Sequence, residues 1–194
     1  DRDAATLDII SGGRAKIGVG LGYQPADFRM FGVDMSKRVE IYEECIEVVR
    51  RCWSGERFSY HGTHFEIDDV QMLPAPIQRP MPLWLGAWAP AAVRRAARMG
   101  DGWMIGPSMS LDELRPLADL YREECEKAGT TPQLILMRDG WVASSRAEAE
   151  RVYGPEVLTA YQYYWRNGAL AFKGMASQSE FTLENLARDR IILG

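Results

Sequence analysis

The sequence predicts a parallel α/β fold, because strand-like and helix-like segments alternate along most of its 194 residues. Two strand ends rich in small residues support this prediction. Residues 17–22 alternate apolar residues with glycines, and residues 82–87 run directly into an alanine-rich helix. The glycines of the first strand, Gly18, Gly20 and Gly22, lack a Cβ, so another molecule can approach the backbone there.

The first third of the chain predicts a helix end, a buried strand and a long helix. Residues 3–10 have the character of last helical turns, which the following glycines close. The near-continuous apolar character of residues 15–20 is typical of a strand buried on both faces. Apolar residues spaced by three and four predict a helix over 37–53, with Ser36 as its cap.

The middle of the chain predicts a hairpin followed by a β/α unit. Two aromatic-rich stretches over residues 57–67 flank a glycine, which indicates a small hairpin outside the main sheet. Residues 74–82 contain four prolines and form a stiff extended connector. A strand over 83–86 and a helix over 91–99 follow, and the next strand covers 103–105.

The last part of the chain carries one strong local signal. Ser110 and Glu113 form a capping box, which opens a helix that runs to Lys127. A strand over 134–143 is interrupted near Arg138. The remaining predicted elements are the beginning of a helix at 146–153, a short helix at 182–188 and a strand at 190–194. Residues 154–179 are not assigned.

This order of elements fits a doubly wound sheet or a barrel, and we favour a barrel. The five main strands cannot close a barrel of eight strands by themselves. The glycine-rich fingerprints of dinucleotide-binding and P-loop proteins are absent from the sequence.

Composition narrows the classes of partner. A formal charge of -4 and a pI near 5.3 argue against nucleic acid and anionic membranes as partners. No apolar run reaches the about 20 residues that span a bilayer. The start has no signal-peptide pattern and no Met, and we interpret it as cut from a longer chain. Cys45, Cys52 and Cys125 form no CxxC pair, which predicts buried free thiols and a reducing, cytoplasmic compartment.

Several segments together resemble the luciferase-like flavin-dependent monooxygenase superfamily, which includes deazaflavin-dependent relatives. They are residues 7–14, 17–22, 23–32, 73–84 and 100–103. The resemblance implies a TIM-barrel-type (β/α)8 fold that is incomplete here, with strands four to eight present and strands one to three absent. Residues 1–194 would then form a single partial barrel domain with a small hairpin insertion.

The resemblance also implies a cofactor site. In the family, the loop after strand five and the first turn of its helix carry the cofactor phosphate, where free N–H groups and the helix dipole attract anions. The end of strand four touches the cofactor as well, although Leu21 stands where some relatives carry a phosphate-binding arginine. The alternatives are an ordinary helix start and glycines that serve packing alone. The implied cofactor-binding residues are Leu21, Gly22, Trp88, Ala89, Ala91 and Ala92.

No catalytic residue and no metal site is predicted. The catalytic histidine that several relatives carry near strand two falls outside the chain, and we interpret His61 and His64 as exposed hairpin residues. Arg14 and Arg38 are interpreted as solvated charges or helix caps rather than phosphate ligands. An aromatic cluster either lines a substrate mouth or packs as a helix face; its members are Tyr161, Tyr163, Tyr164, Trp165 and Phe172.

The implied function is that of a bacterial flavin-dependent monooxygenase, an oxidoreductase acting on a small organic substrate with reduced FMN and O2. A separate flavin reductase would supply the reduced FMN, and we expect a homo-oligomer. One alternative is an F420-dependent hydride-transfer oxidoreductase of the same fold. Another is a non-catalytic flavin-binding remnant.

Overall fold

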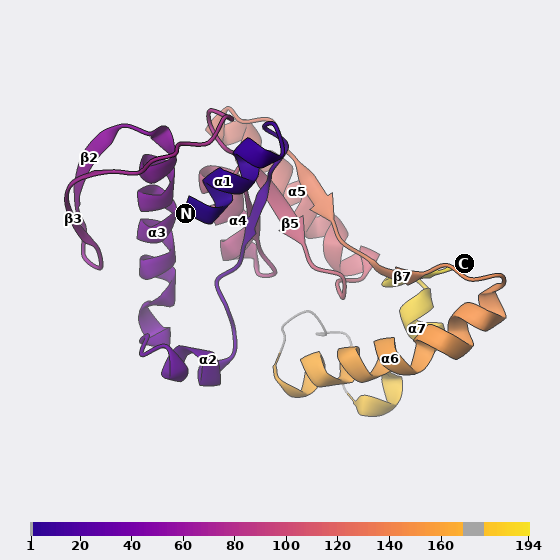
Figure 1. Cartoon of the computed structure of the whole chain (residues 1–194). Coiled ribbons are helices and arrows are strands. Elements are labelled where there is room, and N and C mark those ends of the chain that lie inside the picture. The colour runs from indigo at the N-terminus through magenta and orange to yellow at the C-terminus, as the bar shows by residue number, and fades with distance from the viewer. Residues whose placement is uncertain (1, 169–176) are drawn as a thin grey trace. The chain divides into compact units, whose positions relative to one another are not determined.

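A computed structural model describes residues 2–168 and 177–194 (Figure 1). The chain divides into two compact units. The first unit runs to residue 85 and includes 99–101, and the second comprises 86–98 and 102–194. The boundary therefore falls inside the strand that precedes the predicted phosphate-binding helix.

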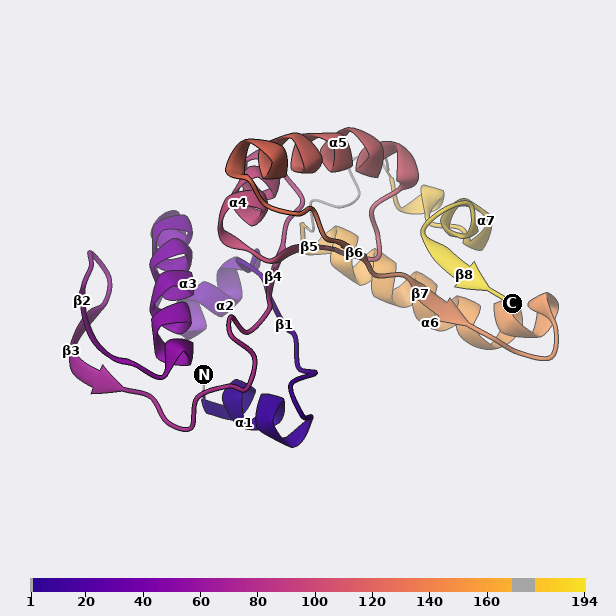
Figure 2. The same cartoon turned by 90° about the horizontal axis from the view of Figure 1, so that it is seen from above.

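The first unit contains one parallel strand pair and one hairpin. β1 lies parallel to β4, with Ile17 opposite Leu83 and Val19 opposite Leu85. β2 and β3 form an antiparallel hairpin beside α3, as both views show (Figures 1 and 2). The elements are α1 (Arg2–Ile10), β1 (Ile17–Val19), α2 (Pro25–Met30), the 3-10 turn η1 (Met35–Lys37), α3 (Arg38–Ser54), β2 (Arg57–His61), β3 (Glu66–Gln71) and β4 (Leu83–Gly86).

A buried carboxylate joins α1 to the proline-rich connector. Asp8 is fully buried and accepts hydrogen bonds from the N–H groups of Ile77, at 2.7 Å, and Gln78, at 2.9 Å. The side chain of Gln78 donates a third bond to Asp8, at 2.7 Å, and another to the carbonyl of Ala15, at 2.6 Å. Burial by itself raises the pKa of Asp8, but the hydrogen bonds from Gln78 and Ile77 outweigh it and hold the pKa below its usual value.

The second unit contains two further parallel pairs. Trp103 of β5 lies opposite Leu134 of β6, and Asp139 of β7 lies opposite Ile191 of β8. Trp103 and Tyr121 pack in its core with ring centroids 5.5 Å apart. The elements are α4 (Pro90–Met99), β5 (Gly102–Ile105), α5 (Leu111–Ala128), β6 (Leu134–Leu136), β7 (Asp139–Trp141), α6 (Arg146–Arg166), the 3-10 turn η3 (Gln178–Glu180), α7 (Leu183–Ala187) and β8 (Ile191–Leu193).

The capping box seen in the sequence acts as predicted at the start of α5. The Ser110 side chain accepts from the N–H of Glu113, and the Glu113 carboxylate accepts from the N–H of Ser110. Gly129 ends the helix in the left-handed region, at φ 68°. Gly55 ends α3 in the same way, at φ 74°. These helix ends are therefore fixed by local sequence.

The prediction that left residues 154–166 unassigned was incomplete, because α6 continues to Arg166. Gly154 and Pro155 hid the helix, since both residues usually weaken a helix interior. Gly154 is buried, and a Cβ there would lie 2.5 Å from Cδ1 of Leu183 in α7. The close approach of α7 explains why glycine occupies this position. Residues 169–176, which include Phe172, lie outside the described residues.

Three other local predictions were wrong. Ser36 does not cap α3; instead Asp34 caps the preceding turn η1 by accepting from the N–H of Ser36, at 2.9 Å. The first strand is not buried on both faces, because Gly18 is exposed and β1 pairs only with β4 among the described residues. Cys45 is exposed, whereas Cys52 and Cys125 are buried free thiols as predicted.

The predicted strand over 134–143 is divided into β6 and β7, which pair with different strands. The helix α2 had no counterpart in the sequence prediction; Pro25 begins it at a position where proline is well tolerated. The predicted α/β class is confirmed, but the strands of residues 2–168 and 177–194 do not close a barrel. The partial (β/α)8 barrel stays a prediction. No helix in these described ranges is long and apolar enough to cross a bilayer.

Candidate functional site

The start of α4 presents free backbone donors. The N–H of Val93 donates to the carbonyl of Ala89 at 2.9 Å, and this bond closes the first turn. The N–H groups of Ala91 and Ala92 precede it and have no hydrogen-bond partner in the described part of the chain. Ala91 is exposed, and the first turn holds no acidic residue. This helix start can therefore accept an anion.

Buried contacts fix the turn that leads into α4. Ala87 is 2% exposed, and its carbonyl accepts a hydrogen bond from the Trp103 indole N–H at 3.0 Å. On the other side of the turn, Val93 and Ala96 are fully buried. Buried residues on both sides of the turn thus fix the backbone that carries the free N–H groups.

Trp88 lies directly against the backbone of Gly106, the residue that follows β5. A Cβ at Gly106 would lie 2.0 Å from Cζ2 and 2.2 Å from Cη2 of the indole. Any side chain at position 106 would displace the ring or the strand end, so Gly106 adjoins the candidate site, although the sequence prediction did not include it. The Gly106-Pro107 pair directly after an apolar strand was the signal that could have found it.

Two arginines hold the loop that follows Gly106. Arg138 donates to the carbonyls of Pro107, at 3.1 Å, and Met109, at 2.8 Å. Arg190 is 8% exposed and donates to the intervening carbonyl of Ser108 at 2.8 Å. Burial lowers the pKa of the Arg138 guanidinium. Three successive carbonyls directly after Gly106 are thus fixed.

A polar cavity of about 500 Å³ lies at the beginning of α5 in the same unit. Ser110, Arg115, Arg188 and Arg190 contribute to its lining, together with acidic side chains that include Asp189. Asp189 accepts a hydrogen bond from the N–H of Leu111 at 2.7 Å. Because charges of both signs line it, the cavity by itself selects neither anions nor cations.

The other predicted cofactor residues, Leu21 and Gly22, belong to the first unit. Gly22 adopts φ +79°, and a Cβ there would lie 3.3 Å from the ring of Phe28 in α2. The Tyr42 hydroxyl donates to the carbonyl of Val19, at 3.3 Å, just before this turn. Trp88, Ala89, Ala91 and Ala92 are contiguous at the start of α4 in the second unit. A single cofactor site built from both groups stays a prediction.

The arginines considered above make local contacts. Arg14 donates to the carbonyl of Ser11 at 2.6 Å, directly after α1. Arg38 donates to the carbonyl of Met35 at 2.8 Å. Both bonds fit the interpretation as helix-end contacts rather than as phosphate ligands.

The aromatic residues of α6 have two different roles. Tyr161 is buried in a cluster with Phe181 and Leu186, and Trp165 packs against that cluster. The helix-packing interpretation is therefore correct for these two residues. Burial raises the pKa of the Tyr161 phenol, and the nearby Asp139 carboxylate raises it further. The remaining described members, Tyr163 and Tyr164, are exposed.

The two histidines also differ. His61 is exposed on β2, as predicted. The prediction of an exposed His64 was wrong, because its side chain is only 13% exposed and pairs with Glu40 at 3.3 Å. This contact joins the hairpin to a side chain of α3, and no sequence pattern reveals it.

Parallel β/α units and a helix start with free N–H groups are typical of α/β proteins that bind phosphate-bearing ligands. Comparison with known proteins specifies the class further. The family model for luciferase-like monooxygenases matches residues 2–194. The chain belongs to the luciferase-like monooxygenase family, which confirms the resemblance seen in the sequence.

Individual relatives differ in cofactor. An uncharacterised protein of Mycobacterium tuberculosis is 34% identical over 86% of this chain, and the F420-dependent glucose-6-phosphate dehydrogenase of Microbacterium testaceum is 30% identical over 95%. The FMNH2-dependent dimethylsulfone monooxygenase of Pseudomonas putida is 26% identical over 96%. The chain spans 58%, 54% and 54% of these relatives, respectively.

The fold similarity also extends to a solved structure. The crystal structure of a Streptomyces bottropensis monooxygenase is 29% identical, with a TM-score of 0.78. The match covers 98% of this chain and 56% of the solved one.

Proposed function

We propose that the chain is the phosphate-binding part of a flavin-dependent monooxygenase, which oxidises a small organic substrate with reduced FMN and O2. The observation that carries this proposal is the pair of free N–H groups of Ala91 and Ala92 at the start of α4. The Pseudomonas putida relative, which is named as FMNH2-dependent, supports the choice of FMN.

The residues at this helix start fit a phosphate group. Alanine side chains leave room for it, and no acidic residue in the first turn repels it. Because Leu21 carries no charge, we expect the N–H groups and the helix dipole to supply most of the attraction, up to about 2 kcal/mol from the dipole. Trp88 and Gly106 would bound the site, since their contact fixes the ring in place.

Bound reduced FMN supplies the electrons with which O2 is activated, and a separate flavin reductase would provide it. The chain's own contribution is to bind the phosphate at α4 and to hold the surrounding loop rigid. The Arg138 and Arg190 contacts to the carbonyls of residues 107–109 serve the second task.

A second candidate function is hydride transfer with the deazaflavin F420. The Microbacterium testaceum relative, which is named as F420-dependent, favours it, because it is 30% identical over 95% of this chain. F420 also carries a phosphate-linked side chain, so the start of α4 suits either cofactor. A non-catalytic flavin-binding protein would use the same helix start without turnover.

The substitution Ala91→Glu tests the proposed phosphate site. A carboxylate about 6 Å from the phosphate costs about 0.7 to 2.8 kcal/mol per pair of charges, so cofactor affinity should fall about 3- to 100-fold. Ala147→Glu is a matched control, since Ala147 is also the exposed second residue of its helix, α6. It should leave cofactor affinity unchanged.

Affinities for FMN and for F420 are measured by calorimetry on the full-length protein. FMN binding that weakens in Ala91→Glu and persists in Ala147→Glu supports the proposal. Tight binding of F420 without FMN binding would replace the first function by the second. Equal affinity in both variants would remove α4 from the site. Flavin binding without oxidation of any substrate would identify the non-catalytic protein.

A further inference from the structure

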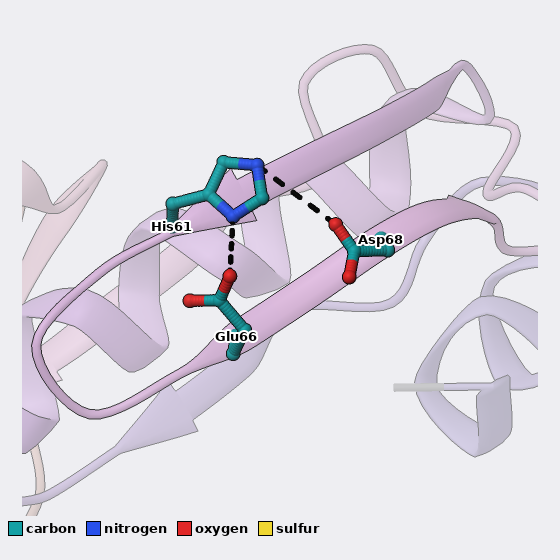
Figure 3. Close-up of side chains that lie close together, drawn as sticks. All are labelled: His61, Glu66 and Asp68. Atoms are coloured by element: carbon teal, nitrogen blue, oxygen red, sulfur yellow. Dashed lines mark hydrogen bonds and ion pairs between the residues drawn. The ribbon is translucent and has the colours of Figure 1, made fainter.

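A cluster of metal-ligating side chains lies on the β2–β3 hairpin, and the proposed function does not use it. This hairpin cluster consists of His61, Glu66 and Asp68 (Figure 3). His61 of β2 lies opposite Glu66 of β3 in the ladder. Asp68 follows Glu66 by two residues, so its side chain projects from the same face of the hairpin. One potential ligand atom from each residue lies within 4.8 Å of the others.

The two ring nitrogens of His61 have different neighbours. Nδ1 lies 2.5 Å from a carboxylate oxygen of Glu66, whereas Nε2 lies 3.9 Å from Asp68 Oδ1. Because an ionised carboxylate only accepts, the proton of the neutral imidazole is on Nδ1. In that tautomer Nε2 carries no proton, and this nitrogen faces the Asp68 carboxylate (Figure 3). A carboxylate that orients a histidine in this way is the usual outer partner of a metal-binding imidazole.

The hairpin that carries the cluster is anchored on both sides. The Glu44 carboxylate of α3 accepts hydrogen bonds from three successive N–H groups, those of residues 63–65, at 2.9, 2.9 and 3.3 Å. Arg57 donates to both the carbonyl and the carboxylate of Asp69, at 3.0 Å each. The ligand atoms therefore sit on a strand pair whose turn and far end are fixed.

We propose that the hairpin cluster binds a divalent transition-metal ion of the Zn²⁺ type. His61 Nε2 and the Asp68 carboxylate are the ligands, Glu66 orients the imidazole, and water completes the coordination. An imidazole nitrogen favours such ions over Mg²⁺ and Ca²⁺, which prefer oxygen ligands alone.

The observed distances require only a small adjustment. Tetrahedral zinc with usual bond lengths places the ligand nitrogen and oxygen about 3.4 Å apart, about 0.5 Å closer than in this structure. The Asp68 side chain is 77% exposed and is therefore free to make this movement.

Calorimetric titration of the full-length protein with ZnCl2 tests the proposal, after residual metal has been removed with a chelator. We expect one Zn²⁺ per chain at this site and no binding of Mg²⁺. His61→Ala and Asp68→Asn should each weaken Zn²⁺ binding at least about 10-fold, and Glu66→Gln about 10-fold without a change in stoichiometry. The matched control is His64→Gln, which changes the chain's other histidine and should leave the affinity unchanged.

Cobalt spectra separate this site from a thiol site, because Cys45 is also exposed. A Co²⁺ complex without a thiolate absorption band supports the hairpin cluster, and a thiolate band would overturn it. Equal Zn²⁺ affinity of His61→Ala and the wild type, or no Zn²⁺ binding at all, would reduce the cluster to a cross-strand ion pair. Circular dichroism verifies that each variant is folded. These measurements involve no flavin, so their failure would leave the proposed function unaffected.

Discussion

Gly106→Ala adds one methyl group at the place where the candidate site has no space for it. The new Cβ would lie 2.0 Å and 2.2 Å from two ring atoms of Trp88, whereas carbon atoms in contact are about 3.5–4.0 Å apart. The indole is rigid, so either the ring or the end of β5 must move by about 1.5 Å. Gly106 has no left-handed backbone angle, so the expected cost comes from this overlap alone.

Overpacking of this kind costs typically about 1–3 kcal/mol. For a chain of this size, each kcal/mol lowers the midpoint of thermal unfolding by about 2–4 °C. Gly106→Ala should therefore lower Tm by about 2–12 °C, which thermal unfolding followed by circular dichroism can measure. The matched control is Gly20→Ala, because nothing lies within 4 Å of a Cβ at Gly20. It should change stability by less than about 0.5 kcal/mol.

A double-mutant cycle with Trp88→Ala identifies the cause. Once the ring is removed, the added methyl group at position 106 meets no clash, so the double variant should be about as stable as Trp88→Ala alone. The reasoning is refuted if Gly106→Ala has the same Tm as the wild type. It is equally refuted if the methyl group costs the same free energy with and without the indole.

Two further predictions concern the first unit. Asp8→Ala removes the buried acceptor of the N–H groups of Ile77 and Gln78 and should lower the free energy of unfolding in urea by about 1–3 kcal/mol. Because the Asp8 pKa is lower in the folded state, the carboxylate stabilises the fold above about pH 4, and this stabilisation is lost as the pH falls through the folded pKa. Asp8→Asn should therefore make the free energy of unfolding less dependent on pH in this acid range. An unchanged pH dependence would contradict the lowered pKa of Asp8. Glu44→Gln should accelerate hydrogen exchange of the amides of residues 63–65 and leave those of α5 unchanged; equal exchange in both proteins would show that Glu44 does not anchor the turn.

Elements with local signals could be predicted from the sequence. The capping box at Ser110 and Glu113 predicted the start of α5. The β2–β3 hairpin and the start of α4 also followed from residues close together in the chain. The free N–H groups at α4 could be anticipated for the same reason, since a helix start depends on few neighbours.

Features that depend on distant residues could not be predicted. Gly154 appears unfavourable in a helix until Leu183 of α7 is seen against it. The ring of Trp88 over Gly106 joins two strand ends, and Arg138 reaches back to the carbonyl of Pro107 across 31 positions. Composition and periodicity carry no information about such pairs, so the predicted site lacked the residues that make it rigid.

The bond from Arg190 to Ser108 has a consequence for biosynthesis. The two residues are 82 positions apart, and a ribosome adds about 5–20 residues per second. Arg190, which donates to the Ser108 carbonyl, is therefore synthesised about 4–16 seconds after Ser108. Throughout that interval the nascent polypeptide exposes a segment whose final partner has not yet been translated. The loop of residues 107–109 therefore reaches its final contacts only after translation has passed Arg190. Slow codons between the two positions would prolong the exposure of this loop to proteases.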